Sequence, residues 1–158
     1  MARTIGVPME ELTRQTAAGH LQTVLVDLIG LSLNGKQLHW HLTGPIFLPV
    51  HAHLDEIIEV TRDYADRIAE RSVTLGVPVD GRPSTIGKDS QIGELEPGWI
   101  DAIYAVDAYA TQLAAVVQRA RIAVDQLDEE KVTQDLVITM LHDLEKHLWM
   151  LQAHVVEQ

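Results

Sequence analysis

Five residues near the middle of the chain have the types and spacing of metal ligands: His39, His51, Asp55, Asp66 and Glu70. His51 and Asp55 are four residues apart, as are Asp66 and Glu70, so in a helix each pair lies on one face, one turn apart. The two pairs share a face to within ~20°, but they lie ~16 Å apart along the helix axis. Because bonds from His or carboxylate to a metal are only ~2 Å long, the two pairs cannot hold one ion within a single straight helix.

A second copy of the chain resolves this difficulty. If two copies of the helix pack antiparallel about a two-fold axis near residues 60 and 61, the first pair of one copy faces the second pair of the other. Two identical sites per dimer result. The alternative is that these acids are ordinary solvated surface charges, which are common on helices.

His39 fits the same scheme because Pro45 lies midway between it and His51, six residues from each. A helical hairpin at this point brings the two imidazoles level. The complete set of two imidazoles and three carboxylates suits iron or another divalent first-row ion and is poor for soft metals.

The elements that must position these residues are predicted to be four long helices. Apolar residues recur every three or four positions on one face of each helix. The first two helices are separated by a turn at 43–49, and the second ends at Leu75 with Gly76 as its cap. A long loop, 76–98, leads to a third helix that opens near Pro97 and breaks at 126–130 before the fourth. The stripes are Leu21, Val24, Leu25, Leu28, Leu31, Ser32, Gly35, Leu38 and His39; Val50, Leu54, Ile57, Thr61, Tyr64, Ile68, Ser72 and Leu75; Ile100, Ile103, Val106, Ala110, Leu113, Val117 and Ala120; and Val132, Leu136, Met140, Leu144, His147 and Leu151.

Two helical hairpins joined by one long crossover predict an all-α, ferritin-like four-helix bundle. We expect one domain over 1–158, with 1–15 as a short N-terminal tail.

Composition narrows the function classes further. The chain has 158 residues, a formal net charge of -11 and no cysteine, so thiolate zinc sites, iron–sulfur clusters and thiol nucleophiles are excluded. The acidic balance favours cations over phosphates as partners. The first residues lack the apolar core of a signal peptide, and no uninterrupted apolar run exceeds five residues. These features predict an intracellular protein that does not span a membrane.

The run from Lys36 to Gly76, KQLHWHLTGPIFLPVHAHLDEIIEVTRDYADRIAERSVTLG, resembles the pattern of the Dps family of mini-ferritins. The shared elements are Lys-Gln-x-His-Trp, Gly-Pro-x-Phe, His-x3-Asp and Asp-x3-Glu-Arg. Similarity extends more loosely over nearly the whole chain, and it implies a short helix in the crossover between the second and third long helices. The family's ferroxidase ligands fall on the five residues selected by spacing.

The resemblance implies a ferroxidase, an oxidoreductase that oxidises Fe(II) to Fe(III) with hydrogen peroxide or dioxygen. It implies that the sites are shared across two-fold dimer interfaces and that each site binds iron, with a di-iron centre as one alternative. Twelve subunits would assemble into a hollow cage. Ferric mineral is stored inside, so iron detoxification and storage protect a cytoplasmic compartment against oxidative stress. Glutamate-rich ferritins with an in-subunit di-iron centre are disfavoured, because no Glu-x-x-His motif occurs in the chain.

Further roles follow from the resemblance, apart from that of His53, which follows from its position well round the helix from His51. Trp40 matches a tryptophan beside the iron site, where interception of a radical and simple packing are equal alternatives. His41, at a position where asparagine is usual, is an extra ligand or a surface histidine, and His53 is expected to be structural or exposed. Acids at the start of the last helix match residues that line the pores for Fe(II) entry: Asp128, Glu130 and Asp135. The alternative is that they only complement the positive end of the helix dipole.

DNA binding is doubtful, because the first fifteen residues carry only Arg3 and Arg14 and the C-terminus, AHVVEQ, has no basic residue. The alternative function is that of a nucleoid-associated, DNA-compacting protein with a secondary iron site. A gel shift across a salt series separates the two functions. A third alternative, an inert helical interaction protein, predicts no metal loading.

Overall fold

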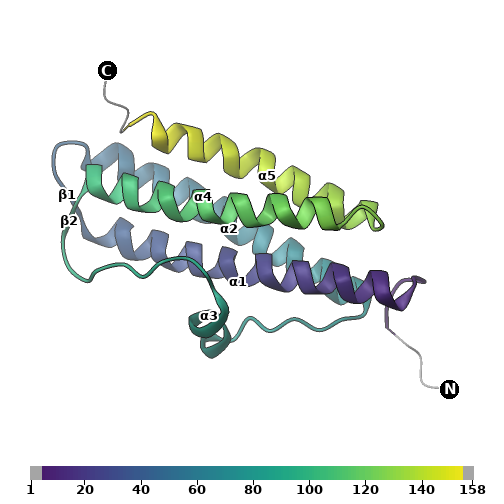
Figure 1. Cartoon of the computed structure of the whole chain (residues 1–158). Coiled ribbons are helices and arrows are strands. Elements are labelled where there is room, and N and C mark those ends of the chain that lie inside the picture. The colour runs from purple at the N-terminus through teal and green to yellow at the C-terminus, as the bar shows by residue number, and fades with distance from the viewer. Residues whose placement is uncertain (1–4, 155–158) are drawn as a thin grey trace.

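The computed structural model describes residues 5–154, and four long helices form its bundle (Figure 1). A fifth, short helix lies in the crossover, as the sequence predicted. The helices are α1 (Glu11–His41), α2 (Phe47–Leu75), α3 (Pro83–Asp89), α4 (Ala102–Gln126) and α5 (Lys131–Gln152). α1 runs antiparallel to α2, and α4 antiparallel to α5, while the crossover returns the chain so that α4 is parallel to α2. This order confirms the ferritin-like fold.

The predicted apolar stripes form one core. Every residue of the α1 and α2 stripes is buried, including Ser32, Thr61 and Ser72 among the apolar side chains. Ile103 and Val132 were wrongly assigned to the core, since they are 47% and 61% exposed. The buried residue lies one position away in each helix, at Ala102 and Thr133, and one position rotates a side chain by about 100°.

α1 is long and apolar enough to cross a membrane by length and composition, but 61% of its apolar window is buried inside the bundle. A core helix has this property. Close packing of α1 depends on Gly35, where a Cβ would lie 2.7 Å from the Tyr109 hydroxyl oxygen. That hydroxyl donates to the Leu31 carbonyl, which fixes α4 against α1.

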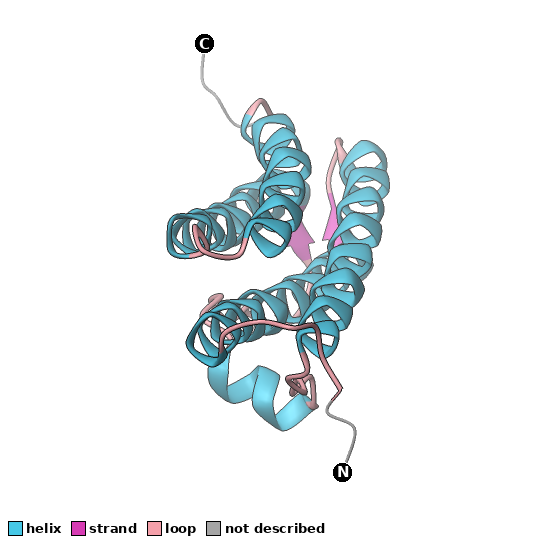
Figure 2. Cartoon of the chain, turned by 90° about the vertical axis from the view of Figure 1, so that its right-hand side faces the viewer, coloured by secondary structure: helices cyan, strands magenta, loops and turns pink. Residues whose placement is uncertain are grey.

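One end of the bundle is closed by two short parallel strands, β1 (Leu42–Thr43) and β2 (Ile100–Asp101). They tie the turn between α1 and α2 to the start of α4 (Figure 2). Gly44 in this turn has φ +97°, and a Cβ there would approach the Asp101 carboxylate to 2.5 Å. Asp101 in turn caps α4 by accepting from the Ile103 N–H, so the third long helix begins at Ala102 and not near Pro97.

The crossover is fixed to the bundle by the Asp27 side chain, which is 1% exposed. Its carboxylate accepts from the Arg119 Nε at 2.5 Å, the Gln91 N–H at 2.9 Å and the Ser90 hydroxyl at 3.2 Å. A buried carboxylate is stable when it is paired and hydrogen-bonded in this way. The long loop is therefore ordered by α1 and α4, and α3 packs on the outside of α1 (Figure 2).

The predicted tail is shorter than fifteen residues, because α1 begins at Glu11. Arg14 belongs to the helix, and its guanidinium donates to the carbonyls of Leu75, Val7 and Met9. Arg14 thus joins the start of α1 to the end of α2. Residues 1–4 of the predicted tail and 155–158 lie outside the described residues.

Candidate metal centre

The hairpin between α1 and α2 brings the His39 and His51 rings together. The rings are stacked, with centroids 3.6 Å apart and planes inclined by 21°. Each Nδ1 lies 3.0 Å from the backbone carbonyl oxygen of the other histidine. The two residues therefore form a reciprocal pair across the helix hairpin, as their equal distance from Pro45 predicted.

These contacts fix the protonation pattern of both rings. A carbonyl oxygen only accepts, so each Nδ1 carries the proton and donates it to the carbonyl. The Nε2 of each ring then keeps its lone pair, which is the form that binds a metal. Burial lowers the pKa of His39, which favours the neutral imidazole.

Asp55 completes a group of three on one protomer. One ligand atom each of His39, His51 and Asp55 lies within 4.8 Å of the others. The Asp55 carboxylate is also bound by the Lys36 ammonium, which holds the pKa of Asp55 below its usual value. Asp55 is thus an anion, and its Oδ1 lies 3.4 Å from the His39 Nδ1.

Asp66 and Glu70 lie further along α2 and do not join this group. Both are exposed. The structure therefore places three of the five predicted ligands in one cluster within the protomer, and the other two on the same helix toward its opposite end. This is the arrangement that the spacing predicted, and the shared site remains a prediction about a second copy of the chain.

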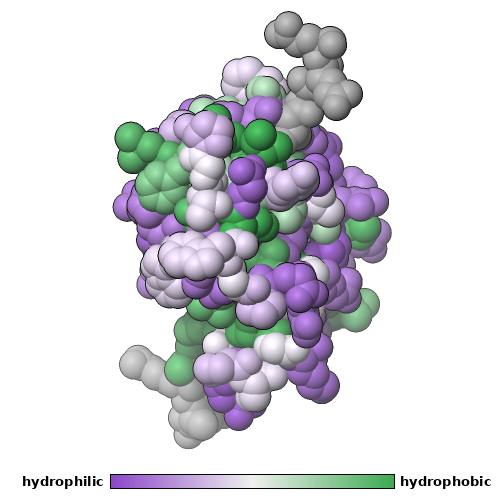
Figure 3. Space-filling view, turned by 90° about the vertical axis from the view of Figure 1, so that its left-hand side faces the viewer, coloured by the Kyte–Doolittle hydropathy of each residue, from purple (hydrophilic) through white to green (hydrophobic). Residues whose placement is uncertain are grey.

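Large apolar side chains are exposed beside the cluster. Trp40 is 63% exposed and Leu48 is 70% exposed, although apolar residues of this size are usually buried. Leu48 lies seven residues before Asp55 and hence on the same face of α2. Figure 3, which views the end of the bundle that carries the turn between α1 and α2, shows apolar side chains interrupting the polar surface. Exposed patches of this kind mark surfaces that associate with another protein chain.

The three predicted pore acids lie at the end of the bundle opposite the histidine cluster (Figure 1). Glu130 is 7% exposed; its carboxylate accepts from the Thr133 N–H at 2.7 Å and from Arg71 at 3.1 Å. These contacts give Glu130 a capping role inside the protomer. Asp128 and Asp135 are exposed, so their place at an opening stays a prediction.

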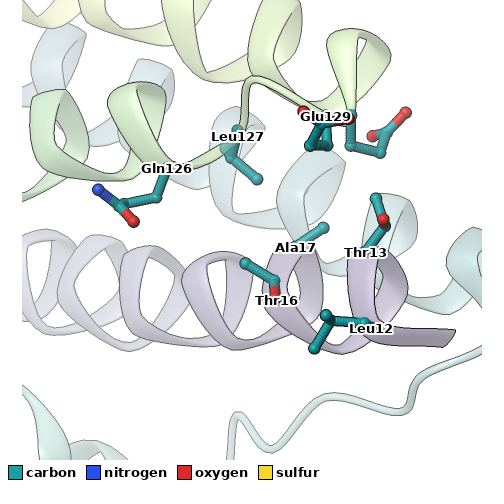
Figure 4. A pocket seen from close by; sticks show the side chains of 8 residues that line it. Leu12, Thr13, Thr16, Ala17, Gln126, Leu127 and Glu129 are labelled. Carbon is teal, nitrogen blue, oxygen red and sulfur yellow. The ribbon is translucent and has the colours of Figure 1, made fainter. Parts of the chain in front are cut away.

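A cavity of about 160 Å³ lies at the same end, between the first turns of α1 and the loop that joins α4 to α5. In Figure 4, Leu12, Thr13, Thr16 and Ala17 of α1 lie opposite Gln126, Leu127 and Glu129. None of the five predicted metal ligands lines it.

A second group of potential ligands was missed by the sequence reasoning. His53, Glu56 and His147 each offer a ligand atom within 4.8 Å of the others. Of the two alternatives expected for His53, structural or exposed, the structure shows the first, because His53 is buried against His147. Its spacing of three from Glu56 was a signal. The pairing with His147, 94 residues away, depends on which face of α5 packs on α2 and could not be read from local spacing.

Comparison with known proteins connects this geometry to a family. The ferritin-like domain family matches residues 18–157. A curated relative, the DNA protection during starvation protein of Agrobacterium fabrum, is 34% identical over 148 residues, which cover 92% of this chain and 91% of the relative. The chain belongs to the Dps family of ferritin-like proteins.

Two solved structures of Dps proteins superpose closely on this chain. Dps from Mycobacterium smegmatis in a tetragonal form has a TM-score of 0.93 at 30% identity, covering 99% of this chain and 96% of that chain. Dps from Microbacterium arborescens in the high iron form has a TM-score of 0.89 at 31% identity, covering 94% and 98%. The ferritin-like fold and the general association of the Dps family with iron follow from these matches.

Proposed function

We propose that this Dps chain oxidises Fe(II), with hydrogen peroxide or dioxygen as the oxidant, at sites shared between two protomers, and stores the ferric product in a closed shell. The observation that carries the proposal is the stacked His39–His51 pair beside Asp55, with both Nδ1 protons committed to backbone carbonyls. Both Nε2 lone pairs are therefore available to the substrate, Fe(II).

The three-residue cluster supplies two imidazoles and one carboxylate, which is too little negative charge for two Fe(II) ions. Asp66 and Glu70 of a second protomer, packed antiparallel on α2, would bring the total to three carboxylates. Their exposure, and that of Leu48 on the same face, supports this use. Further association of such dimers into a shell of twelve subunits follows the family pattern.

The chemistry balances without release of a hydroxyl radical. Two Fe(II) ions each give one electron to one hydrogen peroxide molecule, its O–O bond breaks, and two protons complete two molecules of water. The carboxylates stabilise the increased positive charge of Fe(III), because they are hard anionic ligands. Lys36 positions Asp55 by binding its carboxylate. For Trp40, which follows His39 in the chain and is exposed, we propose that it donates an electron to a radical that escapes.

The proposal is tested by loading the apoprotein with Fe(II) without oxygen, adding peroxide or air to separate samples, and following oxidation and the iron that co-elutes with the protein. We expect fast peroxide-driven oxidation with iron retained in a shell-sized peak. Lys88→Gln is the control, because Lys88 is an exposed residue of α3 and lies outside the proposed contact along α2. A rate equal to that of protein-free iron would overturn the proposal.

The name of the Agrobacterium fabrum relative, DNA protection during starvation protein, raises DNA as a second partner, but the charge of this chain argues against it. Arg14, one of only two basic residues in the first fifteen, is bound to three backbone carbonyls and cannot contact a phosphate without losing them. We therefore place the protein in the cytoplasm as an iron-oxidising shell, not as a DNA-compacting protein. A gel shift at low ionic strength would contradict this.

A further inference from the structure

We propose that His53, Glu56 and His147 form a second, separate site for a borderline divalent ion such as Zn²⁺, contained within a single protomer. The site connects the first part of α2 to the last part of α5, and it does not depend on the proposed ferroxidase function.

The two imidazoles face each other directly. The His53 Nε2 lies 3.1 Å from the His147 Nδ1, with ring centroids 5.3 Å apart. Two nitrogens bound to one tetrahedral Zn²⁺ at ~2.05 Å are separated by ~3.3 Å. The ion would require the two nitrogens to separate by a few tenths of an ångström and both rings to turn so that their lone pairs converge beside the line that joins the nitrogens. Side-chain torsions can supply both changes.

The protons of the pair can be rearranged without a change of charge. In the ion-free pair, one of the two facing nitrogens donates its proton to the lone pair of the other. When an ion binds, that proton moves to the outer nitrogen of the same ring, so both facing nitrogens offer lone pairs. No net proton is released if both rings begin neutral.

Glu56 supplies the third ligand, and its exposure provides access. It lies one helical turn from His53, and its carboxylate is within 4.8 Å of ligand atoms of both histidines. The two imidazoles are 9% and 8% exposed, whereas Glu56 is exposed. A cavity of about 350 Å³, lined by His53, Glu56, Trp149 and Met150, lies beside two members of the group. An ion can enter from this side and keep a water molecule in the fourth position.

The ligand chemistry separates this site from the one near His39. At this site two of the three ligands are neutral imidazoles and one is a carboxylate, a set that suits Zn²⁺. The three carboxylates of the proposed first site suit iron. His53 lies about 200° around α2 from His51, so the two sites face opposite sides of the helix. One ion cannot contact both pairs of histidines.

The test is equilibrium dialysis of the assembled apoprotein against Zn²⁺, followed by Co²⁺ absorption spectroscopy as a probe of tetrahedral coordination. We compare the native chain with His147→Gln and Glu56→Gln. His142→Gln is the matched control, because His142 is an exposed histidine of the same helix. We expect His147→Gln to lose one tightly bound Zn²⁺ per protomer and the matching Co²⁺ band, Glu56→Gln to bind at least about tenfold more weakly, and the control to be unchanged.

Folding and the first site are checked separately. Glu56 is exposed, so Glu56→Gln tests the proposal even if His147→Gln fails to fold. Asp66→Ala should disable Fe(II) oxidation and keep this Zn²⁺ ion, so failure of the two proposals can be distinguished. Unchanged Zn²⁺ stoichiometry and affinity in Glu56→Gln and in folded His147→Gln would show that the pair is only a buried hydrogen bond.

Discussion

Two histidine pairs lie on opposite sides of the first part of α2, and they differ in what their ring nitrogens contact. His39 and His51 each donate Nδ1–H to a backbone carbonyl, so the protein fixes their tautomer. His53 and His147 instead bond to each other, so their tautomers can change. The comparison teaches that histidine chemistry is set by the partner of the second nitrogen.

The two clusters also differ in completeness. The His39 cluster has one carboxylate in the protomer, and in the proposed site a second copy of α2 supplies two more. The His53 cluster takes all three ligands from one chain, by packing α5 on α2. We therefore expect oxidation at the first site to depend on the dimer, and ion binding at the second to be independent of it.

The largest expected effect is that of Asp66→Ala. Because Asp66 is exposed, its removal should leave the free energy of unfolding within about 0.5 kcal/mol of native. The rate of peroxide-driven Fe(II) oxidation should fall at least about tenfold, as expected when a metal ligand is lost. Stopped-flow absorbance measures the rate, and Asp63→Ala, another exposed acid of α2, is the control. A native oxidation rate in Asp66→Ala would contradict the difference proposed between the two clusters, since the first site would then not need Asp66 of a second protomer.

The next effect is that of Leu48→Glu at the exposed apolar face of α2. A charge there should weaken a two-fold contact by at least about 1.4 kcal/mol, a tenfold change in the dissociation constant. Sedimentation at low protein concentration should show smaller species, with Fe(II) oxidation reduced in parallel and Zn²⁺ binding at His53 retained. Ile122→Glu, at an exposed apolar residue near the end of α4, is the control for adding a charge elsewhere. Intact dimers with native oxidation would remove Leu48 from the interface.

A smaller effect is expected for Asp135→Lys, at the end of the bundle remote from both clusters. Reversing this exposed charge should slow Fe(II) entry about two- to fivefold by electrostatic repulsion. Oxidation of iron already bound should be unchanged, which separates delivery from chemistry. The measurement is iron uptake by the shell after sequential additions of Fe(II), with Asp107→Lys, at an exposed acid of α4, as the control. Equal slowing by both variants would indicate a general charge effect and no pore role for Asp135.

The smallest effect concerns the contact between α2 and α5 beside the second cluster. The Tyr64 hydroxyl donates to the Asp143 carboxylate at 2.5 Å, and this bond holds the pKa of Asp143 below its usual value. The bond therefore stabilises the folded state fully at a pH above the ordinary carboxyl pKa of the unfolded chain. This stabilisation is lost as the pH falls through the lowered pKa of Asp143 in the folded chain. Tyr64→Phe should lower the free energy of unfolding by at most about 1 kcal/mol at pH 7. The thermal midpoint of this variant should also fall less steeply than that of the native chain as the pH is lowered, a dependence that we call the acid limb.

The control for this prediction is Thr139→Val, which removes an exposed hydroxyl of α5 without touching Asp143. Its acid limb should match that of the native chain. If the acid limb of Tyr64→Phe equals that of the native chain, the Tyr64–Asp143 bond does not contribute to the pH dependence of stability.

The sequence predicted the bundle and the first cluster because both depend on helical periodicity. Stripes at spacings of three and four specify which face is buried, and Pro45 specifies where the hairpin turns. The predictions were wrong at helix ends, where a capping side chain determines the first helical residue. Asp101 caps α4, so this helix begins after Pro97, and Thr133 is buried where Val132 was expected to be. The pairing of His53 with His147 is tertiary, and no local spacing encodes it.

The most direct test of the shared site mixes two inactive chains. Asp66→Ala and His51→Ala, each with its own affinity tag, are co-expressed, and shells containing both are purified through the two tags. Each heterodimer then has one site with all native ligands and one with two lost. For random pairing, we predict recovery of about a quarter of the native oxidation rate, against nearly none for either chain alone. Mixed shells, verified by mass spectrometry to contain heterodimers, that recover no oxidation would contradict the shared site.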